Sequence, residues 1–236
     1  MRWATFADSL WYIDALASAA KLGFEAFCRQ DYIGADYGLV DCSTGAPLPD
    51  FWSVLLWTQL TTSSVLSATA APIQMGVRSA GTGVAVSEGS DNEDTRSILR
   101  LYAHCTPQTA LSMVPAWGDN SERGKGQTTL VAINLSAKQV EIELDSQGDA
   151  GANNTATLWQ LAPSNQPGID PATGLNGTGL TINGRPLHLL SDGGVPNLQM
   201  FGQAVAAVGS GERVVVKLAP QSISFVVYNS SSHGCS

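Results

Sequence analysis

Beyond residue 62 the sequence is a series of short apolar segments separated by turn residues, and this pattern restricts the fold more than any other feature. Several segments alternate apolar and polar residues, as an antiparallel strand with one buried face does. The segments are 64–70, 97–104, 128–134, 138–144, 155–161, 179–182, 213–218 and 222–228. Because no helical pattern lies between them, they predict an antiparallel β-sandwich.

The first sixty residues show a different pattern. Apolar residues at three- and four-residue steps predict an amphipathic helix over 6–22. A short buried strand is expected at 24–28, and a second helix over 47–60 with Asp50 as its N-cap. Helix, strand, loop and helix make an α/β unit, which is too small to form a closed core alone.

Composition argues against several partners. Only 14% of the 236 residues are charged, and 24 glycines and 11 prolines accompany them, which suits an extracellular β-rich protein. The formal net charge is −8, and the basic residues form no run. Binding to nucleic acid or to an anionic membrane needs clustered Lys and Arg, so neither partner is expected, and a sulfated polysaccharide is a weak candidate. No apolar run is long enough to span a bilayer.

The N-terminal twenty residues are not a signal peptide, because Asp8 and Asp14 interrupt their apolar pattern. A secretory composition without a targeting segment indicates a chain that begins part-way through a larger protein. Secretion is also indicated by four sequons for N-linked glycosylation. The sequons begin at Asn134, Asn153, Asn176 and Asn229.

Four cysteines are present, at positions 28, 42, 105 and 235. They include no CxxC pair, which argues against a structural zinc site, and no other metal or cofactor is expected. Four cysteines allow three disulfide pairings, and their spacing alone leaves all three open.

Residues 29–41, RQDYIGADYGLVD, are too polar for a core strand and too aromatic for an ordinary linker. The surrounding stretch FADSLWYIDALASAAKLGFEAFCRQDYIGADYGLVDCSTGAPLPDFWSVLLWTQL resembles the heparanase-like enzymes of glycoside hydrolase family 79, the plant-type members above all. Those enzymes also have a Cys-Arg-Gln-x-x-Ile-Gly segment, then Asn-Tyr-Gly-Leu, then Pro-Asp-aromatic before a helix that ends in Leu-Leu-Trp-x-Gln-Leu. The similarity is dense over 6–62 and patchier beyond, where RLYAHCTP and the terminal Cys235 also match.

The resemblance implies a (β/α)8 barrel followed by a C-terminal antiparallel β-sandwich. Residues 1–62 would be the last units of the barrel, and residues 63–236 would be the sandwich. The family is retaining and uses two glutamates, one as acid/base and one as nucleophile. Both lie on barrel strands upstream of the matching stretch, and MRWATFADS does not match the nucleophile's Gly-Glu motif. The resemblance therefore places no catalytic residue in this chain.

The loops after the strands carry the active site in such barrels, and residues 29–41 would be the loop after the final strand. The resemblance implies that Asp36 and Tyr37 stand where the family has an Asn-Tyr pair that contacts the glycan. Gly34 and Gly38 would let the backbone approach the sugar ring. Asp36 is a departure from the family, because an ionised carboxylate cannot donate a hydrogen bond to a glycan carboxylate as an amide does.

The family also joins a cysteine of its YxHC strand to a cysteine at the C-terminal end. The resemblance therefore implies a disulfide between Cys105 and Cys235. It further implies that Cys28 is a buried thiol at the end of a barrel strand and that Cys42 is free or exposed.

Several other polar and aromatic residues have expected roles outside catalysis. Arg29 would orient catalytic carboxylates in a complete barrel, but here it is expected to pair with a nearby aspartate. No histidine has a nucleophile or a carboxylate at catalytic spacing, so all three are interpreted as structural. The histidines are His104, His188 and His233. Trp52 and Trp57 are expected to pack in a core or interface, and Trp117 and Trp159 are the better candidates for a sugar platform.

These features predict the C-terminal portion of a heparanase-like glycoside hydrolase of the β-glucuronidase type, acting on uronic-acid-containing glycans of proteoglycans. The chain is expected to be inactive alone and to need a complementary barrel chain. It is expected to be a secreted glycoprotein, outside the cell or in the lysosome or vacuole, with peripheral membrane association. Two alternatives stay open: a non-catalytic carbohydrate-binding β-sandwich module and a non-functional truncated fragment.

Overall fold

The computed structural model describes residues 4–29, 31–34, 37–72, 83–87, 98–113, 127–144, 155–164, 174–208, 213–229 and 235. Two helices come first, α1 (Phe6–Lys21) and α2 (Pro49–Leu60). The strands are β1 (Val65–Leu66), β2 (Thr69–Pro72), β3 (Gly83–Ser87), β4 (Leu99–Cys105), β5 (Gln127–Asn134), β6 (Val140–Leu144), β7 (Thr155–Pro163), β8 (Leu180–Ile182), β9 (Arg185–Pro186), β10 (Gln203–Val208), β11 (Arg213–Leu218) and β12 (Ser222–Asn229). The described residues also form the short 3₁₀ helices η1 (Gln108–Met113), η3 (Gly174–Asn176) and η4 (Leu198–Phe201).

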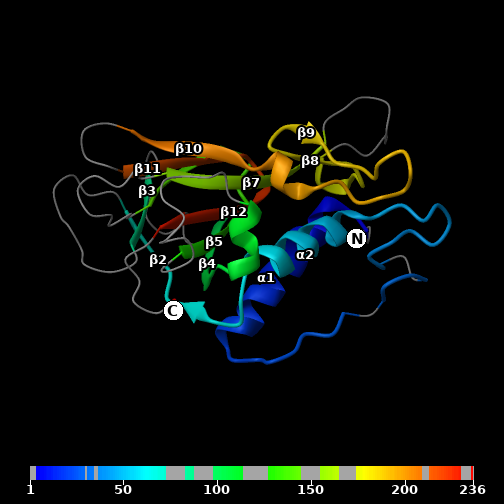
Figure 1. The fold of residues 1–236 in the computed structure, drawn as a ribbon, viewed down its shortest axis with the longest axis horizontal. Helices are drawn as coiled ribbons and strands as arrows, with labels where there is room; N and C mark the ends of the chain where they lie inside the picture. The colour runs from blue at the N-terminus through cyan, green and yellow to red at the C-terminus, as the bar shows by residue number, and fades with distance from the viewer. Residues whose placement is uncertain are drawn as a thin grey trace.

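The strands form two sheets that share β10 (Figure 1). The first sheet has the order β1-β4-β5-β12-β7-β10, and β8 and β9 extend it beside β7. The second sheet has the order β10-β11-β6-β3-β2. Residues 203–206 of β10 pair with β7, and residues 207–208 pair with β11. The strand therefore passes from one sheet to the other. The ladders of the described strands are antiparallel apart from the one between β2 and β3.

Apolar side chains form a core on each face of the first sheet. In β12, Phe225 belongs to the core shared with the helices, and Val226 belongs to the core shared with the second sheet. Residues 222–228 of this strand are all buried. A strand covered on both faces needs apolar residues at nearly every position, which explains the sequence SISFVVY. The two sheets thus pack face to face, and the helices form a third layer.

Helices α1 and α2 lie against the first sheet, on the face away from the second sheet (Figure 1). Their buried side chains include Phe6 and Leu56, which join one core with Trp159 and Phe225 of the sheet. This core therefore contains side chains from both sides of the boundary predicted at residue 62. Burial of these apolar faces supplies most of the stabilisation of such short helices.

Each strand segment predicted from the sequence overlaps at least one of the described strands. Two described strands longer than two residues were not predicted, β3 and β10. Strand β10 has the sequence QAVAAV, in which three of six residues are alanine. Alanine is depleted in strands and carries little of the β-branched and aromatic signal by which strands are recognised. Strand β3 is short, with the sequence GVAVS, and carries an equally weak signal.

The described residues of 1–62 do not show the alternating strands and helices of the barrel units expected there. The described residues of this segment form two helices, and the strand predicted at 24–28 is absent from them. Phe24 is 66% exposed, and Cys28 is an exposed free thiol, so the prediction of a buried strand ending in a buried cysteine is wrong. A buried parallel strand needs a ladder on each side, and no described strand pairs with this segment.

Helix α2 lies within the range of 47–60 predicted for it. Pro49 is at its first position and Leu48 is the N-cap, so the prediction of Asp50 as N-cap is wrong. Proline favours the first helical position because its missing N–H has no partner to lose there. Asp50 instead points its side chain towards α1, where Ser9 Oγ donates a 2.7 Å hydrogen bond to its Oδ1.

Gly202 is expected to tolerate no side chain. A Cβ atom at this position would lie 2.8 Å from Cζ2 of Trp159 and 3.0 Å from Cγ2 of Thr157. Its φ of −58° is open to any residue, so the obstacle is space and not backbone conformation. We expect Gly202→Ala to lower the free energy of unfolding by about 1–3 kcal/mol through overpacking, measured by urea denaturation. In the double variant with Trp159→Phe, which lacks Cζ2, the cost of the added methyl should shrink; an unchanged cost would contradict this explanation.

Candidate functional site

The site loop (residues 24–48) connects α1 to α2 and contains the segment that drew attention in the sequence. It has no regular secondary structure among its described residues, but isolated bridges join Ile33 to Val40 and Val40 to Pro47. Backbone bonds fold it back on itself, including Val40 N to Tyr32 O at 3.0 Å. The loop is therefore an ordered unit built around the buried Val40.

A tight turn of the site loop is fixed by Asp41. Its Oδ1 accepts hydrogen bonds from the backbone N–H and the hydroxyl of both Ser43 and Thr44, at 2.6–2.9 Å. These bonds favour the ionised form and lower the pKa of Asp41 to about 2. An aspartate that bonds to the backbone two and three residues ahead is a common device for turning a chain.

The site residues implied by the resemblance occupy different environments. Gly34 is exposed and has a φ of +128°, a conformation that requires glycine. Tyr37 is half-buried and Gly38 is buried. Asp36 lies outside the described residues.

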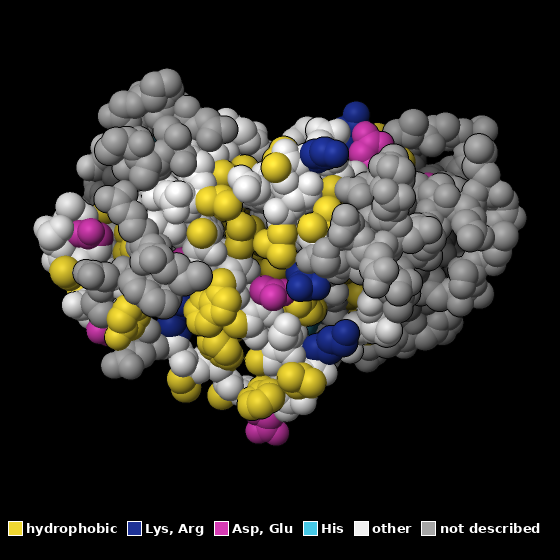
Figure 2. Space-filling model, turned by 180° about the vertical axis from the view of Figure 1, so that it is seen from behind, with side chains coloured by type: hydrophobic (Ala, Val, Ile, Leu, Met, Phe, Trp, Pro, Cys, Tyr) yellow, Lys and Arg dark blue, Asp and Glu magenta, His cyan; other side chains and the backbone are white. Residues whose placement is uncertain are grey.

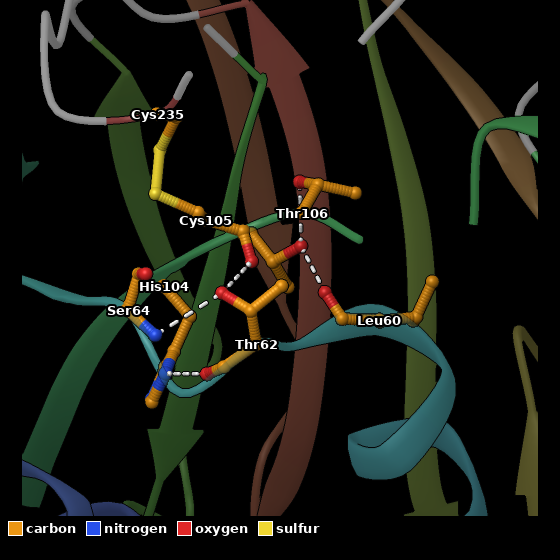
Figure 3. The surroundings of a disulfide bond; sticks show 8 residues. Leu60, Thr62, Ser64, His104, Cys105, Thr106 and Cys235 are labelled. Carbon is orange, nitrogen blue, oxygen red and sulfur yellow. Dashed lines mark hydrogen bonds between the residues drawn. A yellow bond between two sulfur atoms is a disulfide. The ribbon is translucent and has the colours of Figure 1, made fainter. Parts of the chain in front are cut away.

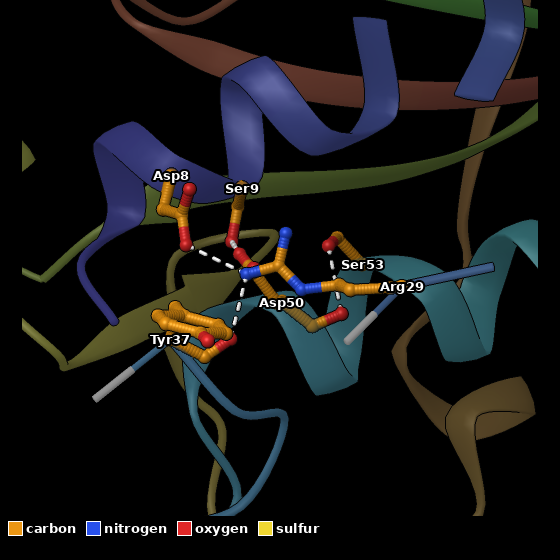
Figure 4. Close-up of polar contacts among 6 residues, drawn as sticks. All are labelled: Asp8, Ser9, Arg29, Tyr37, Asp50 and Ser53. Carbon is orange, nitrogen blue, oxygen red and sulfur yellow. Dashed lines mark hydrogen bonds and ion pairs between the residues drawn. The ribbon is translucent and has the colours of Figure 1, made fainter. Parts of the chain in front are cut away.

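Arg29 connects the site loop to both helices (Figure 4). Its Nη2 donates to Asp8 Oδ2 of α1 at 2.8 Å and to the backbone carbonyl of Tyr37 at 2.9 Å. The same nitrogen forms an ion pair with Asp50 Oδ2 of α2. The side chains of Arg29, Asp8 and Asp50 are 8%, 6% and 1% exposed. These contacts make a buried ion-pair cluster, which we call the Arg29 cluster.

Aromatic rings of α1 form one wall of the Arg29 cluster. The guanidinium carbon lies 4.4 Å from the ring centroid of Tyr12 and 5.8 Å from that of Trp11. A guanidinium over an aromatic face gains cation–π attraction, more so where water is excluded. Tyr12 also packs against Phe27 of the site loop, with ring centroids 6.0 Å apart. The cluster is thus fixed by packing as well as by charge.

Burial sets the protonation of the Arg29 cluster. Burial, as the largest cause, and the negative charge of Asp8 together raise the pKa of Asp50 to about 7, against the lowering effects of Ser9 and Arg29. Burial also raises the pKa of the Tyr12 hydroxyl. Two carboxylates that share one site cannot both ionise freely, because like charges repel strongly where water is excluded.

The expectation that Arg29 pairs with a nearby aspartate is confirmed, but the sequence did not identify its partners. Asp8 and Asp50 each lie 21 residues from Arg29 in sequence. A signal was present, because Asp8 lies among the buried residues of α1 between Phe6 and Leu10. A carboxylate on an apolar helix face needs a buried partner.

A second polar cluster surrounds the disulfide between Cys105 and Cys235, which the resemblance implied (Figure 3). Next to it, His104 is buried, and its Nδ1 donates to the carbonyl of Thr62 at 3.0 Å. Trp57 packs edge-on against the imidazole at 4.9 Å. This histidine therefore has the structural role expected for it.

His104 is expected to make the fold sensitive to acid. Burial lowers its pKa below the ordinary value, and its Nε2 is buried without a hydrogen-bond partner among the described residues. The unfolded chain then takes up the proton first, so stability is fully present above about pH 6.5 and falls as the pH drops below it. In urea titrations between pH 5 and 8, His104→Gln should flatten this fall, whereas His188→Gln, at an exposed site, should leave it unchanged.

The structure also shows whether several other predicted site residues are buried or exposed. Trp159 is fully buried, so its proposed role as a sugar platform is wrong, whereas Trp52 is in the core as expected.

Asn134 is also fully buried, and its Nδ2 donates to the carbonyls of Lys138 and Ala219. A glycan on that nitrogen is incompatible with these bonds. Asn176 and Asn229, which begin two other sequons, are exposed. Three predicted residues lie outside the described residues, Trp117, Asn153 and His233.

Hydrophobic side chains are exposed on α1 and the first half of the site loop. This apolar surface consists of Trp11, Leu22, Phe24, Phe27, Tyr32 and Ile33. The segment after α1 runs along the lower edge of the molecule in Figure 1, and hydrophobic side chains gather at that edge in Figure 2. Among the described residues, no group of histidine, cysteine and acidic side chains is placed to hold a metal ion, and no helix is long and apolar enough to span a membrane.

Comparison with known proteins agrees with the resemblance seen in the sequence. Heparanase-like protein 1 of Arabidopsis thaliana is 26% identical over 98% of this chain and 38% of its own length. Baicalin-beta-D-glucuronidase of Scutellaria baicalensis is 27% identical over 94% of this chain and 32% of its own length. Inactive heparanase-2 of Homo sapiens is 27% identical over 83% of this chain and 28% of its own length. The chain thus resembles heparanase-like proteins over most of its length, and these names point to a glycoside hydrolase family.

The chain spans about a third of the length of the curated relatives it matches. No family model matches it. Among solved structures, a glycoside hydrolase family 30 xylanase from Clostridium acetobutylicum superposes on 98% of this chain and 41% of its own length, with a TM-score of 0.49 and 12% identity. A similarity of that strength does not bear on function.

Proposed function

We propose that this chain is the C-terminal portion of a heparanase-like glycoside hydrolase of the β-glucuronidase type, and that it supplies the site loop as one wall of the sugar subsite. The observation that carries the proposal is the attachment of this loop. Arg29 holds the backbone carbonyl of Tyr37 and is itself held by buried carboxylates on both helices. A wall of a binding site needs such support, because ligand contacts depend on the rigidity of the backbone that carries them.

The catalytic glutamates of the family, on this proposal, come from a part of the barrel that the chain does not contain, and the chain alone is inactive. The apolar surface supports a partner of this kind. Trp11 is 56% exposed and Phe24 is 66% exposed, and they lie on the helix and loop that the resemblance assigns to the barrel. Contiguous exposed apolar side chains commonly mark a surface that is covered in the working protein. The occupant proposed is a complementary barrel chain.

We also propose a secreted protein, located outside the cell or in the lysosome or vacuole. The disulfide between Cys105 and Cys235 supports this location, since such bonds persist in oxidising compartments. The exposed side chains of Asn176 and Asn229 are open to glycosylation in the same pathway. Peripheral association with a membrane, as expected from the sequence, is proposed for the same location.

The test is binding of a glucuronide, p-nitrophenyl β-D-glucuronide, to the purified chain, followed by NMR. The proposal expects shifts at Tyr37 and Gly38 without release of nitrophenol, and loss of binding in Tyr37→Ala. Tyr32→Ala is the matched control, because Tyr32 is an exposed tyrosine of the same loop. Shifts confined to the two sheets would favour a carbohydrate-binding module, and aggregation without any binding would favour a non-functional fragment.

Position 36 provides a second test of the uronic-acid assignment. An ionised aspartate repels a glycan carboxylate, whereas the asparagine of the family donates a hydrogen bond to it. Asp36→Asn should therefore strengthen glucuronide binding at pH 7 without affecting a neutral glucoside. Equal effects on both sugars would remove the uronic-acid part of the proposal.

A further inference from the structure

Arg29 Nη2 is in contact with more acceptor oxygens than it has hydrogens to donate. This nitrogen carries two hydrogens, but three oxygens contact it, from Asp8, Asp50 and the carbonyl of Tyr37. A guanidinium N–H makes one strong bond at a time, so the three acceptors compete. A protonated carboxyl would resolve the competition, because it donates a hydrogen bond and no longer needs an N–H.

The charge balance leads to the same conclusion. Among the described residues, the titratable side chains in contact with Arg29 are Asp8 and Tyr12 from α1 and Asp50 from α2. The site loop contributes the backbone carbonyl of Tyr37, which does not titrate. With both carboxylates ionised, the buried cluster has a net charge of −1; with one added proton it is neutral. Burial disfavours the net charge, and the pair therefore retains a proton at a higher pH than an isolated aspartate does. The pKa of Asp50, raised to about 7, agrees with this count.

We propose that Arg29 is a positioning residue for the site loop, and that one proton shared by Asp8 and Asp50 controls its hold on the carbonyl of Tyr37. With the proton present, Nη2 donates to Asp8 and to Tyr37, and the loop is fastened to both helices. Without the proton, two carboxylates occupy the two N–H groups, and the bond to Tyr37 is lost. The loop is thus held at mildly acidic pH and loosened above neutrality.

The experiment follows two kinds of NMR signal, from carboxyl carbons and from an amide nitrogen, in the 236-residue chain between pH 5 and 8.5. The carboxyl carbons of Asp8 and Asp50 report the proton. The amide nitrogen of Gly38 reports the bond, since it belongs to the same peptide unit as the carbonyl of Tyr37. The expected result is one titration, well above the ordinary range of aspartate, shared by a carboxyl carbon and by Gly38. Separate midpoints, or two carboxyls that both titrate below pH 5, would overturn the proposal.

Two variants separate positioning from simple stability. Asp50→Asn mimics the protonated carboxyl and should fix the Gly38 signal near its acidic position, with no titration left in this range. Arg29→Lys keeps the charge but loses the planar guanidinium fork. The amide nitrogen signal of Gly38 should then no longer titrate together with the carboxyl carbons. Asp14→Asn is the matched control on α1, because Asp14 bonds to Tyr102 and not to Arg29. If Arg29→Lys does not fold, Asp50→Asn alone decides, and a wild-type titration of Gly38 in that variant would overturn the proposal.

The consequence for sugar binding rests on the proposed function. Glucuronide binding should weaken as the pH rises through the shared titration in the wild type but not in Asp50→Asn. Absence of binding at every pH, with the Gly38 titration intact, would count against the proposed function and leave the role of Arg29 established. Binding that weakens equally in both proteins would overturn the link between the proton and the site.

Discussion

Removal of the disulfide is expected to lower the free energy of unfolding by about 4 to 5 kcal/mol. The bond between Cys105 and Cys235 closes a loop with a sequence separation of 130 residues. In the chain-entropy account, a cross-link over so long a loop excludes most of the expanded conformations of the unfolded chain. The double substitution Cys105→Ser and Cys235→Ser should therefore shift the urea midpoint strongly downward, measured on the oxidised protein by far-UV circular dichroism.

The matched control for this measurement is Cys42→Ser. Cys42 is an exposed free thiol of the site loop, and its replacement should leave the urea midpoint unchanged. Reduction of the wild type should reproduce the loss seen in the double variant. A loss below about 1 kcal/mol would mean that the ends of the loop are held together in the unfolded chain by other contacts.

Trp159→Ala is expected to cost about 3–5 kcal/mol, the range for truncating a fully buried aromatic residue. Trp159 is 0% exposed in the core between the first sheet and the helices. Its Nε1 donates a 3.0 Å hydrogen bond to the carbonyl of Leu198, which fastens η4 to the sheet. Urea denaturation measures the loss, and near-UV circular dichroism should report the disturbed packing.

Two comparisons make the Trp159 result specific. Trp159→Phe keeps an aromatic ring but removes the donor, and should cost only part of the loss seen with alanine. Trp11→Ala removes an exposed indole of α1 and should change the free energy of unfolding by much less. A similar loss in Trp11→Ala would show that Trp159 is not the main anchor of this core.

The sheets were predictable because most of their strands carry a strong local sequence signal. Strands β5 and β12 combine β-branched residues with turn residues at their ends, and their segments were identified within one residue. Strand β10 could not be identified, since its position depends on pairing with two strands from different sheets. The strand expected at 24–28 failed for a related reason: an apolar run becomes a strand only where another strand is available to pair with it.

The Arg29 cluster shows where the sequence stops being informative about the site. The motif drew attention to Tyr37 and to Arg29, but the arrangement that joins them depends on two helices meeting. The sequence predicted Asp50 as a helix cap, because it directly precedes an apolar helical segment. Its partners in the structure, Ser9 and Arg29, are distant in sequence, and no local pattern contains them. The apolar neighbours of Asp8 were the one hint that this carboxylate is buried.

The position of β12 affects how the protein is made. It lies between β5 and β7 in the first sheet, yet it is the last of the described strands to leave the ribosome. Until then, β5 and β7 have no partner at their facing edges, and unpaired edges of nascent chains invite association with other chains. The described part of the first sheet therefore cannot close until β12 has been synthesised. We therefore expect a nascent chain stalled before residue 222 to depend on chaperones.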